Sequence, residues 1–119
     1  MRILTIRQPW AHLIVRDGKD IENRDWPTKY RGPFLVHAAQ RIDLDGCKRH
    51  RIDPDKLVTG GVVGMAEIVD CVDRHRSKWF VGKYGFVLRK RKWLPFTPWK
   101  GSLGLREAPR PLLRKLGLI

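Results

Sequence analysis

One short segment of the sequence holds the densest group of side chains that could carry out a reaction. Lys19, Glu22 and Arg24 lie within the six residues from Lys19 to Arg24. A lysine acts as a nucleophile or base only when its amine is neutral, so burial or neighbouring cations must lower its pKa. Glu22 and Arg24 could then position water and stabilise developing negative charge. The simpler alternative is a phosphate clamp, in which Lys19 and Arg24 bind the phosphate and Glu22 orients them.

The spacing of these residues is compatible with two backbone conformations. In an extended strand, Glu22 and Arg24 share one face and Lys19 lies on the other. In a helix or tight turn, Lys19 and Glu22 meet because they are three residues apart. Spacing alone therefore leaves open which charges meet, and a solvated charged loop is compatible with it too.

Aromatic residues form a second candidate group. The sequence has five tryptophans and two tyrosines. An aromatic ring beside Arg or Lys can hold an unstacked base, whereas most aromatic residues of a small domain pack in its core. We expect about one or two of the seven to touch a base. Those close to basic or turn residues are Trp10, Trp26, Tyr30, Trp79 and Tyr84.

The net charge points to a negatively charged partner. Lys and Arg together number 25 and Asp and Glu number 12, which gives a formal net charge of +13. Nucleic acid is the commonest polyanion inside a cell, so RNA or DNA is an expected partner.

Several other classes of site and protein are disfavoured. Cys47 and Cys71 are the only cysteines, and the histidines lack metal-ligand spacing, so we expect neither a metal nor another cofactor. Only two serines are present, and no Gly-x-Ser-x-Gly motif occurs. No apolar run approaches the length of a membrane span, and the N-terminus is not typical of a signal peptide. We therefore expect a cytoplasmic protein without membrane contact.

The pattern of short apolar runs predicts the elements that must position these side chains. Residues 1–119 are expected to form one mainly β domain of α+β type with short flanking helices. Gly18 is expected to cap the first helix, and Gly64 to bend the long central strand. Pro54 is predicted in a loop and Ser77–Gly82 in a turn or short helix. Predicted strands cover Arg2–Ile6, Phe34–Ala38, Val62–Val72, Tyr84–Leu88 and Ser102–Leu105. Predicted helices cover Trp10–Val15 and Leu44–His50, with a basic, helical tail from about residue 109.

Several motifs in order along the chain resemble the ASCH (activating-signal-cointegrator homology) domain. One position departs from the family motif Gly-x-Lys-x-x-Glu-x-Arg, since Asp17 occupies the glycine position and Gly18 follows it. We interpret this as a shifted turn. The matching segments are Ile6-Arg7-Gln8-Pro9-Trp10-Ala11, Lys19-x-x-Glu22-x-Arg24, Tyr30-Arg31-Gly32-Pro33, Gly60 to Gly64 leading into Ile68-Val69-Asp70-Cys71, Trp79-Phe80, Gly82-x-Tyr84-Gly85-Phe86-Val87-Leu88, and Lys100-Gly101.

This resemblance implies a fold and an activity. The fold would be a PUA-like β pseudobarrel of five or six strands, and family members are associated with RNA or DNA binding. Some small bacterial members are amidohydrolases that remove the acyl group from N4-acylated cytidine. Their catalytic lysine corresponds to Lys19, and Glu22 stands where they carry a hydroxyl-bearing residue. Their second catalytic carboxylate would correspond to Glu67, with Asp70 or Asp73 as alternatives.

Three hypotheses follow, and we expect a monomer in each. The first is an amidohydrolase acting on N4-acylcytidine-like nucleosides through Lys19, Glu22 and Glu67. The second is a non-catalytic RNA- or DNA-binding module, which the +13 charge favours. The third is a ribonuclease. The expected nucleoside-binding residues are Arg7, Gln8, Pro9, Trp10, Arg24, Trp26, Trp79 and Tyr84, and those expected to contact a nucleic-acid backbone are Arg31, Arg89, Lys90, Arg91, Lys92 and Lys100.

Overall fold

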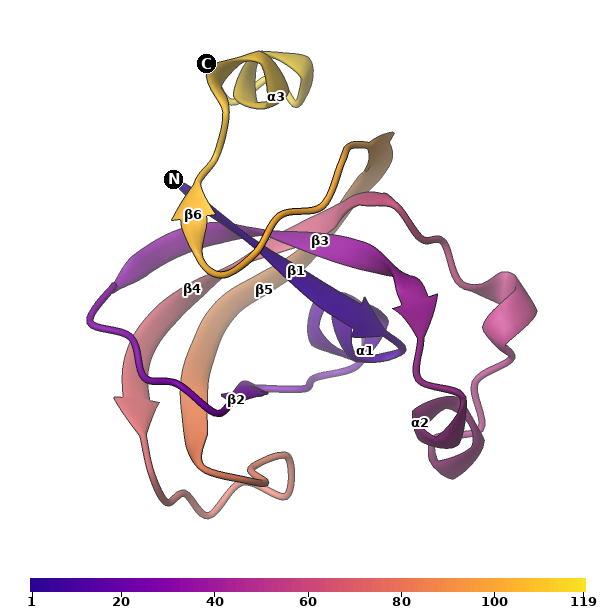
Figure 1. Ribbon diagram of the computed structural model, residues 1–119, viewed down its shortest axis with the longest axis vertical. Coiled ribbons are helices and arrows are strands. Elements are labelled where there is room, and N and C mark those ends of the chain that lie inside the picture. The colour runs from indigo at the N-terminus through magenta and orange to yellow at the C-terminus, as the bar shows by residue number, and fades with distance from the viewer.

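Six strands form one strongly curved, mixed sheet in the computed structural model, which describes all of residues 1–119 (Figure 1). The strand order is β2-β5-β4-β3-β1-β6, and only the neighbours β1 and β3 run parallel. This architecture confirms the predicted mainly β, PUA-like pseudobarrel. The strands are β1 (Arg2–Gln8), β2 (Ile21–Arg24), β3 (Gly32–Ile42), β4 (Gly61–Val72), β5 (Tyr84–Pro98) and β6 (Arg106–Glu107).

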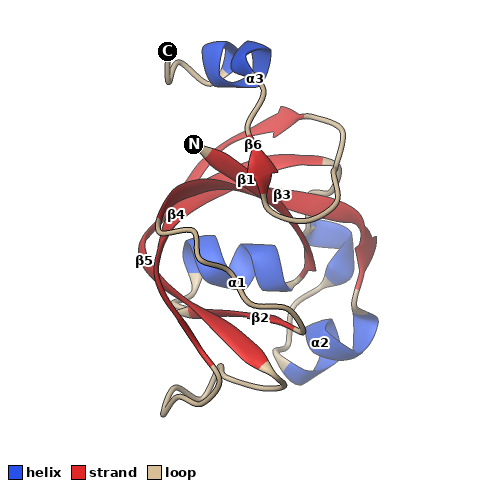
Figure 2. Cartoon of the chain, turned by 60° about the vertical axis from the view of Figure 1, so that its left-hand side comes forward, coloured by secondary structure: helices blue, strands red, loops and turns tan.

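Three short α-helices accompany the sheet: α1 (Trp10–Arg16), α2 (Leu44–Arg49) and α3 (Arg110–Lys115). α1 packs against the concave face of the sheet, inside the ring of strands seen in Figure 2. The Asp43 carboxylate accepts a hydrogen bond from the backbone N–H of Gly46, which fixes the start of α2. No helix has both the length and the apolar character that crossing a lipid bilayer requires.

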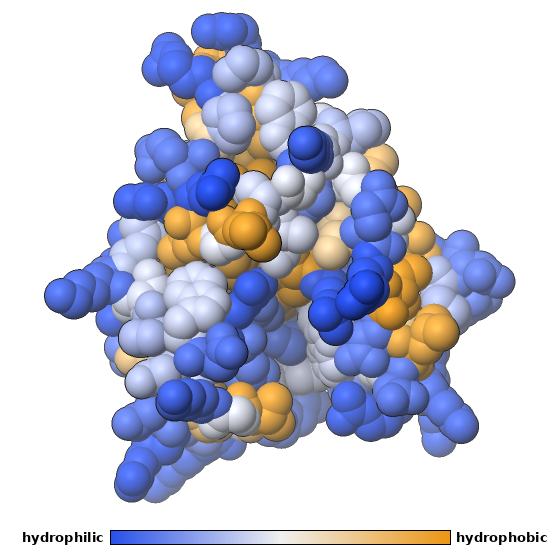
Figure 3. Space-filling model, in the orientation of Figure 1, coloured by the Kyte–Doolittle hydropathy of each residue, from blue (hydrophilic) through white to orange (hydrophobic).

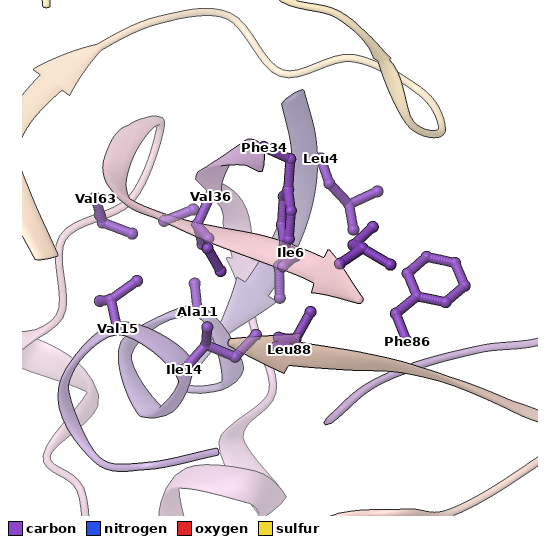
Figure 4. Packing of buried hydrophobic residues seen from close by; sticks show 13 residues of the cluster. Leu4, Ile6, Ala11, Ile14, Val15, Phe34, Val36, Val63, Phe86 and Leu88 are labelled. Atoms are coloured by element: carbon purple, nitrogen blue, oxygen red, sulfur yellow. The ribbon is translucent and has the colours of Figure 1, made fainter. Parts of the chain in front are cut away.

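Two apolar clusters lie on opposite faces of the sheet. In the inner cluster, Figure 4 shows Ile6, Val36 and Leu88 of the strands pointing toward Ala11 and Ile14 of α1. Such burial is the main favourable term in folding a domain of this size. The outer cluster attaches the C-terminal helix, and it contains Ile3, Leu35, Val62, Ala108 and Leu112.

The seam of the pseudobarrel is closed by a side chain rather than by strand pairing. β2 is an end strand of the sheet, and β1 lies across the opening from it. The Arg24 Nη2 on β2 donates a hydrogen bond of 2.8 Å to the backbone oxygen of Thr5 on β1. Arg24 therefore belongs both to the fold and to the group of charges that the sequence singles out.

The structure corrects three predicted elements. The strand predicted to end at Leu88 continues through the basic run to Pro98, because β4 offers a long partner and shifts of register absorb the irregularities. No strand forms over Ser102–Leu105, where Gly104 has a φ of +67° that ends extended backbone. β6 follows this segment instead. Pro54 starts a 3₁₀ turn, Pro54–Lys56, rather than lying in an irregular loop.

Gly64 allows α1 and β5 to approach β4 closely. A Cβ at this position would collide with the Lys92 backbone oxygen and the Val15 side chain. We predict that Gly64→Ala lowers the free energy of unfolding by about 3 kcal/mol, because neither the strand nor the helix can move without disturbing the core. Urea denaturation measures the loss. Gly117→Ala is the control, because it meets no neighbouring atom and has only a left-handed φ of +72°. Its cost should be about 1 kcal/mol, and equal losses would contradict the prediction.

Candidate active site

A pocket of about 970 Å³ opens at the seam between β1 and β2. Its walls come from β1, the start of α1, β2, the end of α2, the loop between β4 and β5, and the loop after β5. In Figure 3 this face of the molecule is hollowed between the parts that carry β2 and α2, and hydrophilic residues border the hollow. The volume is in the range of small-molecule sites.

Lys19, Glu22 and Arg24 form one connected ionic group in the pocket. The Lys19 Nζ lies 3.6 Å from Glu22 Oε1, and the Arg24 Nε donates to Glu22 Oε2 over 2.9 Å. Lys19 lies in the turn before β2, whereas Glu22 and Arg24 share one face of the strand. The turn predicted as one alternative therefore describes the contact of Lys19 with Glu22, and the extended strand predicted as the other describes the contact of Glu22 with Arg24.

Lys19 is a buried lysine whose side chain is only 3% exposed. Its Nζ also donates to the backbone oxygen of Ile21. Burial lowers the pKa of Lys19 below its ordinary value, and the nearby Arg24 lowers it further, while Glu22 and Asp20 act in the opposite direction. Burial is the largest of these effects. A lysine in this state reaches its neutral form at a lower pH than a solvated one, as a base or nucleophile must.

Three rings form an aromatic wall along one side of the pocket, made of Trp10, His50 and Trp79. The ring of His50 stacks on that of Trp79 at 5.3 Å and meets Trp10 edge-on at 5.4 Å. The Trp10 Nε1 donates to Asp43, which is the residue that caps α2. Trp26 also lines the pocket, and it packs edge-on against the core residue Phe86. A planar base could stack on these rings.

The loop between β4 and β5 carries Trp79, and Asn23 of β2 holds it in place. The Asn23 Nδ2 donates to the Trp79 backbone oxygen over 2.8 Å, and Asn23 Oδ1 accepts from the Val81 N–H over 3.0 Å. The Ser77 hydroxyl adds a hydrogen bond of 2.6 Å to Asp20. Asn23 occupies a variable position of the family motif, so the sequence offered little signal for this role.

We predict that Asn23→Ala detaches this loop. Both hydrogen bonds are lost, so the free energy of unfolding should fall by about 1 to 2 kcal/mol. Amide hydrogen exchange at Val81 should become faster, because its N–H loses its acceptor. Asn23→Asp is the matched control, since it keeps an acceptor for Val81 and loses only the donor to Trp79. Unchanged protection of Val81 in the alanine variant would show that the loop is held in another way.

The pocket brings together most of the residues that the sequence predicts to contact a nucleoside. Three others lie outside the lining. Gln8 is buried, donates to the backbone oxygen of Val58 and accepts from the N–H of His12, so its amide is occupied within the fold. Pro9 immediately precedes α1, and Tyr84 of β5 is the register partner of Arg24 on the neighbouring strand β2. The predicted residues that line the pocket are Arg7, Trp10, Lys19, Glu22, Arg24, Trp26 and Trp79.

The predicted second carboxylate lies elsewhere. Glu67 is on β4 outside the lining and lies 3.6 Å from the Lys90 Nζ, while Asp70 pairs with Arg31 at 3.8 Å. Asp73 is outside the lining as well, and the carboxylates inside it are those of Glu22 and Asp25. The predicted backbone-binding residues, Arg31, Arg89, Lys90, Arg91, Lys92 and Lys100, also lie outside the pocket.

Sequence reasoning missed other pocket residues besides Asn23. Arg49 and His50 reach the lining from the end of α2, and Lys78 reaches it beside Trp79. A basic residue preceding a candidate base-stacking tryptophan was the available signal for Lys78. Nothing local in the sequence indicated that α2 would reach this pocket.

His37 holds the loop after β5, which forms the remaining wall. One ring nitrogen, Nε2, lies 2.6 Å from the Trp99 backbone oxygen and therefore carries a proton that it donates. The Thr5 hydroxyl lies 3.2 Å from Nδ1 and accepts from the Ser102 N–H. This chain of contacts places Ser102, Leu103 and Gly104 at the pocket.

Comparison with known proteins identifies the family. The family model of the ASCH domain matches residues 4–101. Activating signal cointegrator 1 of Homo sapiens is 28% identical over 87 residues, which are 63% of this chain and 15% of the human protein. The Mus musculus protein of that name is 28% identical over 83 residues, or 60% of this chain and 14% of the mouse protein. The chain thus spans a small part of these curated relatives.

Solved structures agree on the fold. ASCH from Zymomonas mobilis superposes with a TM-score of 0.62 and 14% sequence identity, covering 98% of this chain and 92% of that one. A tyrosine-to-phenylalanine variant of the same protein gives a TM-score of 0.62 and 15% identity, covering 98% and 95% of the two chains. With the family match over residues 4–101, the chain belongs to the ASCH domain family.

Proposed function

We propose that this protein hydrolyses the N4-acyl amide of a modified cytidine, with Lys19 as the central catalytic residue. The observation that carries the proposal is a buried lysine with a lowered pKa, linked to a carboxylate and a guanidinium inside a pocket large enough for a nucleoside. Small bacterial members of the family with this activity use the lysine that corresponds to Lys19, and this supports the assignment.

In the proposed reaction, neutral Lys19 acts as a base. It takes a proton from a water molecule whose oxygen attacks the acyl carbonyl carbon. The Arg24 guanidinium stabilises the oxyanion that forms, and Glu22 keeps Lys19 and Arg24 in position. When the bond between the carbonyl carbon and N4 breaks, Lys19 returns its proton to N4. The products are the carboxylic acid and cytidine, and no other reactant is needed.

The aromatic wall supplies the base-binding part of this proposal. A pyrimidine ring stacked on Trp10 or Trp79 would lie beside the ionic group, since Trp10 is also within 5.9 Å of the Lys19 Nζ. Stacking on an aromatic side chain contributes about 1 to 3 kcal/mol per base. Trp26 also lines the pocket and could contact the ligand.

Incubation with N4-acetylcytidine tests the proposal, with release of cytidine followed by chromatography. A panel of N4-acyl groups extends the test, and N6-acetyladenosine serves as the control for recognition of the pyrimidine. Turnover of the cytidine derivatives alone is the expected result. Absence of turnover across the panel, by protein shown to be folded, would overturn the proposal.

A second candidate function is binding of RNA or DNA, which the basic part of β5 favours. Arg89, Lys90, Arg91 and Lys92 follow one another along this strand, and only Lys90 has an ion-pair partner. Lys90→Gln with Lys92→Gln should weaken polynucleotide binding and reduce its dependence on salt. Titrations with RNA and DNA at several salt concentrations measure this, and gels of the same RNA samples detect cleavage. An unchanged salt dependence would contradict a role for this strand.

A further inference from the structure

The charges of the pocket do not balance. Besides Lys19 and Arg24, which share Glu22, the lining contains three further cations: Arg7, Arg49 and Lys78. No ion pair within 4.0 Å engages any of these three. Asp25 is the only other carboxylate of the lining. The pocket therefore presents a surplus of positive charge to a ligand.

Two of these cations lie over rings of the aromatic wall. The Arg49 guanidinium lies 5.7 Å from the centre of the Trp10 ring, and the Lys78 Nζ lies 5.1 Å from that of Trp79. His50 lies between the two tryptophans, since its ring stacks on that of Trp79 and meets that of Trp10 edge-on. A base stacked on the aromatic wall would carry its substituents toward one cation or the other.

An acidic group near Arg49 is already engaged. Asp43 lies near Arg49, but its carboxylate accepts hydrogen bonds from Trp10 Nε1 at 3.2 Å and from the Gly46 N–H at 3.0 Å. These hydrogen bonds, with the smaller effect of Arg49, hold the pKa of Asp43 below its usual value. Asp43 is thus a structural part of the α2 start and leaves the Arg49 donors free for a ligand.

A neutral nucleoside has no negative charge to pair with these cations, whereas a phosphate has. We infer that the pocket binds cytidine as a phosphate-bearing nucleotide, with Arg49 and Lys78 as the phosphate-binding residues. This inference rests on the proposed function only in placing a pyrimidine in the pocket. The phosphate has two chemical sources, a free mononucleotide or a cytidine unit within an RNA chain. Arginine and lysine side chains close to aromatic rings suit both.

Calorimetric titration of the wild-type protein with reaction products tests this inference without depending on hydrolysis. The ligands are cytidine, cytidine 5′-monophosphate, cytidine 3′-monophosphate and a short oligonucleotide containing one cytidine, at one low salt concentration. We expect one of the monophosphates to bind about tenfold more tightly than cytidine. Arg49→Gln with Lys78→Gln should remove most of this preference and leave the affinity for cytidine almost unchanged. Arg110→Gln with Arg114→Gln, on α3 outside the pocket, is the control with the same change in net charge.

The outcomes separate this inference from the proposed function. Equal affinity for cytidine and both monophosphates would overturn the phosphate site and leave the nucleoside hydrolase intact. If the two double variants lose the preference for the monophosphate equally, the preference is a general effect of net charge, and this result also overturns the phosphate site. If none of the four ligands binds, the pocket does not bind a pyrimidine, and both the inference and the proposed function are overturned. If the preference is seen, tighter binding of the oligonucleotide than of either monophosphate identifies RNA as the source, and equal or weaker binding identifies the free nucleotide.

Discussion

Lys19→Met is expected to lower kcat/KM for N4-acetylcytidine by about 10⁴-fold, which is the upper range for loss of an acid–base group. Methionine fills nearly the same volume without a charge, so the fold should be retained. Lys19→Arg is the informative companion. Arginine keeps a cation for binding phosphate, but it cannot become neutral at the pH of an assay. Hydrolysis should therefore be lost in both variants, as chromatographic rates can show.

A phosphate clamp makes the opposite prediction for arginine. If Lys19 only binds an anion, Lys19→Arg should retain much of the wild-type activity and affinity, while Lys19→Met loses both. Circular dichroism and urea denaturation of each variant establish that the comparison is made between folded proteins. Substantial turnover by the arginine variant would therefore exclude Lys19 as the base.

The pH dependence of hydrolysis follows from Lys19. Because burial lowers the pKa of Lys19, the rate should rise with pH along a limb whose midpoint lies below the ordinary lysine value of 10.5. Stability should change in the same direction. Below the pKa that Lys19 has in the folded protein, its buried ammonium destabilises the fold to the full extent. Between that pKa and 10.5, Lys19 is neutral in the folded protein and protonated only in the unfolded chain, so the penalty is relieved as pH rises. Wild-type stability should rise with pH relative to Lys19→Met over this interval, and parallel curves would contradict the shift.

Strands with an apolar centre next to glycine or proline were predictable, namely β1, β3 and β4, whereas β2 and β6 contain no apolar run and were not predicted. β4 and α1 match the predicted segments within one or two residues. The basic part of β5 was not predictable in this way, because Arg89 to Lys92 extend a strand through pairing with β4 and not through local preference. The helix of the C-terminal tail was predicted, but its docking was not, because it depends on a distant contact of Leu112 with Ile3 and Leu35.

The residues of the candidate site also divide into those predictable from local sequence and those placed by tertiary structure. Lys19, Glu22 and Arg24 are close in sequence, so their proximity was visible in advance. The loop that carries Trp79 is held at the pocket by contacts with distant residues, among them the hydrogen bond from Asn23 across 56 residues of chain. Arg49 and His50 arrive from α2, whose position depends on the path of β3. Local patterns therefore located the ionic group, whereas the residues that surround a ligand come from tertiary structure.

Glu22→Gln is expected to have the largest effect on stability. The Glu22 side chain is only 7% exposed and lies between Lys19 and Arg24. Glutamine keeps an oxygen to accept from Arg24 but removes the negative charge, which leaves two cations close together. Removal of one partner from a buried ionic group costs about 3 kcal/mol or more. Urea denaturation measures the loss, and Asp25→Asn, the other carboxylate of the pocket, should change stability by about 0.5 kcal/mol or less.

Combining this change with Lys19→Met shows whether the loss arises from the charges. Without the Lys19 ammonium, loss of the Glu22 charge leaves a single cation, so the double variant should be more stable than the sum of the two single changes predicts. In Glu22→Gln alone, the pKa of Lys19 should fall further, because Glu22 is the main group that raises it. The limb of the pH–rate profile should therefore move to lower pH, whatever the maximal rate. If the stability changes of the two single variants are additive and the limb of the pH–rate profile does not move, Glu22 acts on neither Lys19 nor Arg24 through its charge.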